Sequence, residues 1–186
     1  SDGIAGLEVN VSCPNVESEG MAFGVDPKVV EQVTKAVRKV TDKPVIVKLS
    51  PNVTDIVEIA KAVEAGGGNG VSLINTLLGM AIDIHRRKPL LGNIYGGLSG
   101  PAVKPVALRM VHQVYKGVTI PIIGLGGIMS GTDAIEFMMA GAQAVQVGTA
   151  TMVDPTAISR IAREMGDFVE QYNLNSITDI VGAVHQ

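Results

Sequence analysis

Short apolar runs alternate along this chain with longer stretches in which apolar residues recur every three or four positions. The short runs, rich in Val, Ile and Leu, predict buried β-strands at residues 6–12, 43–50, 70–75, 120–127 and 144–149. The longer stretches predict amphipathic helices at residues 26–40, 54–67, 101–117, 131–142 and 154–172. The order is strand then helix, repeated five times, which predicts an α/β fold.

The predicted helices carry recognisable start and stop signals. Asp26 and Pro27 suit the N-cap and the first helical position of the first helix. The second helix is expected to begin with Thr54 as its cap and to end at a glycine. In the third helix, Pro105 is expected to lie in the first turn, where its missing N–H does no harm.

Near-continuous apolar strands joined by helices indicate a parallel sheet that is covered by helices. The segments that follow the strands carry polar residues and glycines, whereas the segments that precede them are plain. In a (β/α)8 TIM barrel the carboxyl ends of the strands form the active site, so this asymmetry favours a barrel. An open doubly wound sheet would gather its ligand groups at one switch point and is the less favoured alternative.

A complete barrel contains eight βα units in about 250 residues, whereas this chain supplies five units in 186 residues. We therefore expect residues 1–186 to form a single domain that is the C-terminal part of a barrel, with the N-terminal units missing. Counted in this way, the last two predicted strands are the seventh and eighth of the barrel. Barrels commonly bind a phosphate after those two strands.

Composition argues against several classes of function. The net charge is -3, tryptophan is absent, and no basic cluster exceeds Arg86-Arg87-Lys88, so we expect no nucleic-acid partner. No apolar run approaches the roughly 18 residues that a membrane span needs, so we expect no membrane association. The chain has one cysteine, which allows no internal disulfide and suits a reducing cytoplasm.

Two residues at strand ends are candidates for chemistry. Cys13 is either a small buried hydrophobe or a thiolate that acts as nucleophile or general base, and its position leaves both readings open. No His nearby suggests itself as an activating partner, which favours proton abstraction over acyl transfer. Lys48 ends an apolar strand, where it either meets an anionic or electron-rich ligand or extends into solvent.

Asparagines and glycines also gather after the strands. Asn10, Asn15 and Asn75 could read a planar ring with adjacent C=O and N–H groups, although Asn is also a common turn residue. The glycines of residues 124–128 and 147–150 allow close backbone approach, and the helix N-terminus after each would favour a phosphate. Gly100 is either a further backbone contact or a plain helix lead-in.

The three histidines show no spacing typical of metal ligands, so we expect no metal. His112 falls within a predicted helix, His185 lies beside the last residue, and His85 belongs to the basic loop with Arg86 and Arg87.

Six stretches of the chain resemble the dihydroorotate dehydrogenase family: NVSCPNV, VIVKLSPNV, GVSLINTLLGMAIDI, GGLSGPAVKPVALRMV, IPIIGLGGI and AVQVGTA. They occur in the family's order and cover essentially the whole chain, beginning near the family's fourth barrel strand. Membrane-associated, quinone-using members carry serine where this chain has Cys13, so the cysteine indicates the soluble class. Within that class the chain most resembles the catalytic, FMN-binding subunit of the NAD-dependent subtype.

The resemblance implies FMN-dependent oxidation of dihydroorotate to orotate in pyrimidine biosynthesis. Cys13 would be the base that removes the proton from carbon 5, while hydride from carbon 6 passes to nitrogen 5 of FMN. The implied substrate contacts are Asn10, Asn15, Asn75 and Thr76. The implied cofactor contacts are Asn10, Lys48, Ile74, Gly100, Gly126, Gly127, Gly148 and Thr149, the last four around the phosphate.

The resemblance also implies partners. Catalytic subunits of the NAD-dependent subtype dimerise within a heterotetramer, whose other subunit carries FAD and a 2Fe-2S cluster. A homodimeric, fumarate-using dihydroorotate dehydrogenase is an alternative, and so is a related flavin barrel that reduces uracil-like rings. A phosphate-binding barrel isomerase or aldolase, with Lys48 as a Schiff-base lysine, is an alternative of a different class.

Overall fold

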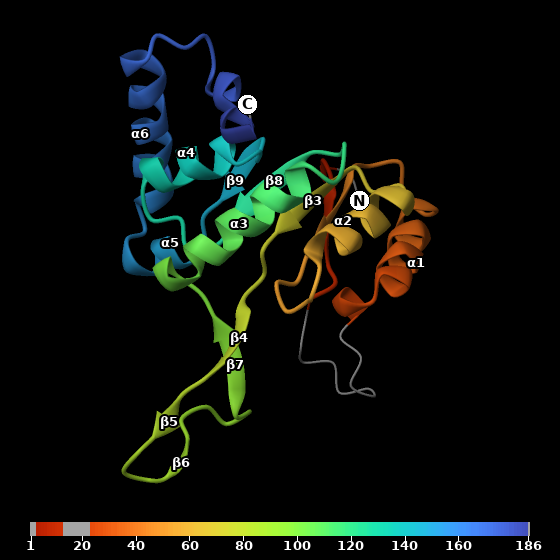
Figure 1. The fold of residues 1–186 in the computed structure, drawn as a ribbon, viewed down its shortest axis with the longest axis vertical. Coiled ribbons are helices and arrows are strands. Elements are labelled where there is room, and N and C mark those ends of the chain that lie inside the picture. The colour runs from red at the N-terminus through yellow and green to blue at the C-terminus, as the bar shows by residue number, and fades with distance from the viewer. Residues whose placement is uncertain (1–2, 13–22, 186) are drawn as a thin grey trace.

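The computed structural model describes residues 3–12 and 23–185, which form a parallel sheet in the order β1-β2-β3-β8-β9 (Figure 1). Its strands are β1 (Leu7–Asn10), β2 (Val45–Lys48), β3 (Gly70–Leu73), β8 (Ile122–Leu125) and β9 (Ala144–Gln146). Each strand lies within its predicted range. Neighbours in the sheet follow the order of the chain, without the reversal that defines an open doubly wound sheet. This order is the one that a barrel requires.

The sheet is strongly curved, because side chains from its two edge strands meet. Strands β1 and β9 are separated by three others, and at about 4.8 Å per step a flat sheet would hold them roughly 19 Å apart. The Nε2 atom of Gln146 nevertheless donates a hydrogen bond to Oε2 of Glu8 at 3.1 Å. Two side chains cannot span a flat sheet of that width, so the sheet curls as a barrel wall does.

Helices cover one face of the sheet (Figure 1). They are α1 (Pro27–Arg38), α2 (Ile56–Ala65), α3 (Lys104–Tyr115), α4 (Gly131–Met139), the short α5 (Thr149–Val153) and α6 (Ala157–Gln171). All except α5 lie within predicted ranges. Val45 and Val47 of β2 are fully buried in the core that these helices complete, together with Phe137 of α4. Ile46 and Lys48 alternate with them and point to the other face, which is only partly covered.

The helix ends show which side chains satisfy the first backbone N–H groups. Asp26 is the N-cap of α1, as predicted, and accepts a hydrogen bond from the N–H of Lys28 at 2.8 Å. The prediction of Thr54 as the cap of α2 is wrong. Asp55 is the N-cap and accepts from the N–H of Val57 at 2.8 Å, because the helix begins one residue later than expected. The predicted glycine stop is confirmed, with Gly66 as the C-cap.

The segment between β3 and α3 forms an arm, where the sequence pattern predicted only a long loop. Strand β4 (Leu77–Met80) pairs antiparallel with β7 (Tyr95–Leu98), and β5 (Ile82–Asp83) pairs with β6 (Lys88–Pro89). Figure 1 shows this arm projecting away from the helices and the main sheet. Its strands are two to four residues long, and β4 and β7 contain glycine, so they lack the alternation by which strands are found in a sequence.

Four short 3-10 helices complete the described chain: Phe23–Val25, Pro101–Val103, Ile177–Ile180 and Ala183–His185. The last of them returns to the body of the protein, where the His185 ring stacks on His112 of α3 with a centroid distance of 4.1 Å. The Nε2 atom of His185 also lies 3.0 Å from the carbonyl oxygen of Ala140. Within the ranges that the structure describes, every helix is too short or too polar to cross a membrane.

Candidate functional site

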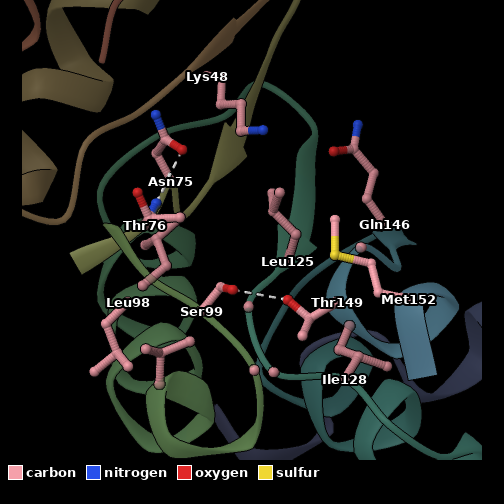
Figure 2. A pocket seen from close by; sticks show the side chains of 16 residues that line it. Lys48, Asn75, Thr76, Leu98, Ser99, Leu125, Ile128, Gln146, Thr149 and Met152 are labelled. Carbon is pink, nitrogen blue, oxygen red and sulfur yellow. Dashed lines mark hydrogen bonds between the residues drawn. The ribbon is translucent and has the colours of Figure 1, made fainter. Parts of the chain in front are cut away.

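A pocket of about 240 Å³ opens at the carboxyl ends of the strands (Figure 2). It is lined by residues that end or follow β2, β3, β8 and β9, and by the base of the arm. The lining residues are Lys48, Ile74, Asn75, Thr76, Leu98, Ser99, Gly100, Val103, Leu125, Gly126, Gly127, Ile128, Gln146, Gly148, Thr149 and Met152. Segments far apart in sequence therefore meet at the end of the sheet where barrels bind their ligands.

Most of the predicted site residues line this one pocket. They are Lys48, Ile74, Asn75, Thr76, Gly100, Gly126, Gly127, Gly148 and Thr149. Asn10 does not line it directly, but its Oδ1 atom lies 3.5 Å from Nδ2 of Asn75. Cys13 and Asn15 lie outside the described residues. Among the lining residues that the sequence analysis missed, Ser99, Gln146 and Met152 are the ones whose side chains carry a hydroxyl, an amide and a thioether.

Hydrogen bonds tie the end of β1 to its neighbours. The backbone N–H of Ser12 donates to Oδ1 of Asn10 at 3.1 Å, and the Ser12 hydroxyl donates to the carbonyl oxygen of Lys48 at 2.8 Å. Ser12 and the preceding Val11 are both buried. Asn75 completes the group, since its Nδ2 atom donates to the carbonyl oxygen of Ser12 at 3.5 Å. The chain therefore leaves β1 from a fixed point beside Lys48 and Asn75.

Lys48 brings a positive charge to one end of the pocket. It pairs in register with Asn10 on one side and with Ser72 on the other, so these three side chains lie on the same face of the sheet. Figure 2 shows the Lys48 ammonium on the same side of the pocket as the Asn75 amide, with the Gln146 amide across from it. This end can therefore donate and accept hydrogen bonds around a polar ring.

Glycines form the other end of the pocket. Gly126 and Gly127, which follow β8, have φ angles of 129° and 78°, which favour glycine. A Cβ atom on Gly127 would lie 2.6 Å from the carbonyl oxygen of Gly100 and 2.9 Å from the backbone nitrogen of Lys104. The backbone at Gly127 therefore packs directly against the backbone of Gly100 and Lys104. A Cβ atom on Gly148 would meet nothing within 4 Å, so that position faces open space. The hydroxyl of Thr149 donates to that of Ser99 at 2.9 Å.

The helix after β8 differs from the expectation that its N-terminus would favour a phosphate. Helix α4 begins at Gly131 with a reciprocal capping box between Ser130 and Asp133. Lys104 also donates to Asp133 at 2.6 Å. Although burial by itself raises the pKa of Asp133, the hydrogen bonds from Lys104, the Met129 N–H and Ser130 hold that pKa below its ordinary value. Because a carboxylate already occupies this helix end, the glycine loop is the better anion contact.

Asn52, which the sequence analysis did not single out, supports the base of the arm. Its Nδ2 atom donates to the carbonyl oxygen of Thr76 at 3.2 Å, and its Oδ1 atom accepts from the N–H of Leu78 at 2.9 Å. The Asn52 backbone N–H donates to the hydroxyl of Ser50 at 3.2 Å. The loop after β2 thereby holds the loop after β3. Its only sequence signal is an asparagine after a serine and a proline, which is ordinary turn composition.

The two ends of the pocket suit different parts of one elongated ligand. Lys48, Asn75 and Gln146 offer a cation and amides, which match a planar ring with C=O and N–H groups. Gly126, Gly127 and Gly148 offer close backbone approach, which matches a phosphate. Apolar side chains also line the pocket and can pack against the faces of a ring: they are Ile74, Leu125 and Ile128.

Comparison with known proteins gives concordant results. The profile of the family described as dihydroorotate dehydrogenase matches residues 4–169. A protein of Desulforamulus reducens, "Dihydroorotate dehydrogenase B (NAD(+)), catalytic subunit", is 63% identical over 185 residues, which are 100% of this chain and 61% of that protein. The protein of the same name from Geobacter sp. strain M21 is 59% identical over 182 residues, which are 98% of this chain and 60% of that protein. This chain thus spans about three fifths of these relatives.

A solved structure shows the same fold. The crystal structure of DHODH in complex with ferulenol, from Eimeria tenella, superposes with a TM-score of 0.80 at 24% sequence identity. The match covers 98% of this chain and 54% of that one. Together with the chain-ordered, curled parallel sheet, this likeness confirms the predicted (β/α)8 barrel class, and the five βα units of this chain form part of such a barrel.

Proposed function

Because this chain belongs to the dihydroorotate dehydrogenase family, we propose that the protein of which it forms part oxidises (S)-dihydroorotate to orotate in pyrimidine biosynthesis. One observation carries the proposal. The residues that the family resemblance assigns to cofactor and substrate, from Lys48 to Thr149, line a single pocket although they come from separate strands. We further propose that residues 1–186 form the C-terminal part of a single barrel domain in the cytoplasm.

FMN fits the residues of this pocket. Gly126, Gly127, Gly148 and Thr149 would hold its phosphate, since the backbone there leaves no room for side chains at Gly127 and is open at Gly148. Lys48 would lie at the ring end, where a positive charge stabilises a reduced, anionic flavin. When bound, FMN supplies the acceptor for the hydride that leaves carbon 6 of dihydroorotate.

The chain's own residues would hold the substrate and move its proton. Asn75 and Thr76 would bind the pyrimidine ring together with Asn10, whose side chain already lies against Asn75. Asn15 would join them. Cys13 would take the proton from carbon 5 on its Sγ atom. Ser12, which precedes Cys13 in the sequence, is buried and donates to the carbonyl oxygen of Lys48, which supports this role.

Electrons would leave through a partner. The relatives named above are catalytic subunits of NAD(+)-linked enzymes, so we propose NAD as the final acceptor. A second subunit that carries FAD and a 2Fe-2S cluster would transfer the electrons, and two catalytic subunits would dimerise within a heterotetramer. Purification of the intact protein followed by iron and flavin analysis tests this proposal. Fumarate-dependent turnover by an iron-free homodimer would replace it with the fumarate-using subtype.

Flavin absorbance and two variants of Cys13 test the reaction. Cys13→Ala should retain FMN yet lose most of the bleaching of the flavin spectrum by dihydroorotate. Cys13→Ser should restore slower bleaching, with its optimum shifted to higher pH, because a hydroxyl is a poorer base. Near-normal bleaching by Cys13→Ala would refute the base assignment. A full-length protein without flavin, in which Lys48 is trapped by borohydride with a carbonyl substrate, would instead support the aldolase alternative.

A further inference from the structure

Gln146 is a polar residue in the otherwise apolar end of β9, and the proposed function gives it no role. Its side chain lines the pocket. Figure 2 shows its amide oxygen turned towards the side on which Lys48 lies, with its nitrogen turned away. The nitrogen donates a hydrogen bond to Oε2 of Glu8 on β1 at 3.1 Å.

The chemistry of Glu8 fixes this orientation of the amide. A carboxylate only accepts hydrogen bonds, so Gln146 must present its NH2 group to Glu8 and its carbonyl oxygen to the pocket. Glu8 is itself held, because the hydroxyl of Ser72, a fully buried residue of β3, donates to its other oxygen. Ser72, Glu8 and Gln146 thus form a chain of hydrogen bonds across the inner face of the curled sheet. The chain ends in an acceptor that faces the site.

We propose that Gln146 is a further cofactor-binding residue, whose carbonyl oxygen accepts a hydrogen bond from a donor group of FMN, and that Glu8 is the positioning residue that orients it. This inference rests on the proposed function. The wall of the pocket that carries Lys48 offers a donor, and the wall that carries Gln146 offers an acceptor. FMN needs both, since its ring edge carries C=O groups beside the N3–H group, and its ribityl chain carries hydroxyls.

Binding of FMN by the full-length apoprotein tests the pair directly. Fluorescence titration should show about tenfold weaker binding by Gln146→Leu, which loses one buried hydrogen bond. The unbranched Gln146→Met gives a second variant of matched length. Glu8→Gln should weaken binding by a smaller factor, because its own amide allows Gln146 to turn over. The double variant Glu8→Gln/Gln146→Leu should bind no more weakly than Gln146→Leu alone, because Glu8 acts through Gln146.

Matched substitutions outside the pocket provide the control. Gln113 on α3 and Glu58 on α2 are exposed and bond only to neighbours on their own helices in the described part of the chain. Gln113→Leu and Glu58→Gln should bind FMN as the wild type does. Thermal unfolding of each apoprotein shows whether a variant is folded before its affinity is compared.

Two flavin analogues identify the donor group. N3-methyl-FMN lacks the ring N–H group, and 2′-deoxy-FMN lacks a ribityl hydroxyl. The analogue that lacks the donor group should bind the wild type about tenfold more weakly than FMN does. The Gln146→Leu variant should bind that analogue and FMN with equal affinity. This inference alone would be overturned if the wild type binds FMN and both Gln146→Leu and Gln146→Met bind it with the affinity of the wild type and the same preference among the analogues. Wild type that binds no FMN would overturn the proposed function as well.

Discussion

The side-chain amide nitrogen of Asn52 lies 3.2 Å from the carbonyl oxygen of Thr76, while its amide oxygen accepts from the N–H of Leu78 at 2.9 Å. The side chain of Asn52 therefore bonds the backbone carbonyl of Thr76 and the backbone N–H of Leu78, as the backbone of a neighbouring strand would. Thr76 lines the pocket and Leu78 begins the exposed part of the arm. The geometry at the substrate end thus depends on a residue that does not line the pocket.

Replacement of Asn52 by alanine should raise the KM for dihydroorotate more than it lowers kcat. The loss of two hydrogen bonds, about 1–3 kcal/mol, would loosen the backbone that carries Thr76 without touching Lys48 or the glycine end. Affinity for FMN should therefore change little. Steady-state kinetics of the full-length protein measure the split, and Asn93→Ala, at an exposed position on the arm, is the control. An unchanged KM would show that the loop after β3 keeps its conformation without the hydrogen bonds from Asn52.

Substitution of Gly127 by alanine should remove FMN from the purified protein and lower its melting temperature. A Cβ atom there would lie 2.6 Å from Gly100 O and 2.9 Å from Lys104 N, and the φ angle of 78° is strained for alanine. Gly166→Ala is the matched control: nothing lies within 4 Å of its Cβ position in helix α6. The control should gain about 0.5–1 kcal/mol of stability. Flavin content and thermal unfolding report both effects.

Patterns within a few residues of one another predicted most of the fold. The five main strands and helices lie within their predicted ranges, because burial on one face leaves a period in the sequence. The cap of α2 was misplaced by one residue, since Thr54 and Asp55 are both good caps and only the path of the chain chooses between them. The arm was missed because its glycines break the alternation by which strands are found.

Contacts between residues far apart in the sequence could not be predicted from local patterns. Glu8 and Gln146 are 138 positions apart, and they meet only because the sheet curls. Asn52 reaches Thr76 for a similar reason, since two loops end at the same rim. The glycines and Lys48 could be predicted because a residue without a side chain, or a charged one, is unusual at the end of an apolar strand. Gln146 and Asn52 were missed because a single glutamine in a strand, or an asparagine that follows Ser50 and Pro51, is ordinary composition.

The docked C-terminal segment should loosen as the pH falls from about 7 to 5. Burial, followed by the charges of His185 and Lys116, holds the pKa of His112 below its ordinary value of 6.5. A group with a lowered pKa in the folded state binds fewer protons there than in the unfolded chain. Stability is therefore fully present above pH 6.5 and is lost as the pH falls towards the lowered pKa. The Tyr115 ring also packs on the His185 ring, with a centroid distance of 4.7 Å.

Hydrogen exchange of residues 177–185 at pH 7.5 and pH 5.5 measures this loosening. His112→Phe keeps a ring against His185 but removes the titrating group, so its exchange should depend less steeply on pH than that of the wild type. His85→Phe, on the exposed arm, controls for the loss of a histidine elsewhere. Equal pH dependence in the wild type and His112→Phe would assign the effect to other groups.

Lys104 should contribute more to stability than other lysines that form ion pairs. It lies at the start of α3 with its backbone against Gly127, and its ammonium bonds Asp133 at 2.6 Å and Glu136 at 3.0 Å on α4. The hydrogen bond that Lys104 donates to Asp133 is the main reason that the pKa of Lys104 is raised. Lys104→Met should cost about 1–2 kcal/mol, since it leaves the half-buried Asp133 without its cation.

Chemical denaturation of Lys104→Met and Lys61→Met separates this contribution from that of an ordinary pair. Lys61 bonds Glu58 on the same exposed helix face, so its loss should cost less than about 0.5 kcal/mol. Because the pKa of Asp133 is lowered, the stability from its pairing is present above pH 3.8 and is lost as the pH falls through the folded-state value. The gap between Lys104→Met and wild type should therefore shrink in acid. A gap that stays constant until the protein unfolds in acid would mean that the lysine acts through its aliphatic stem, by packing α3 against α4.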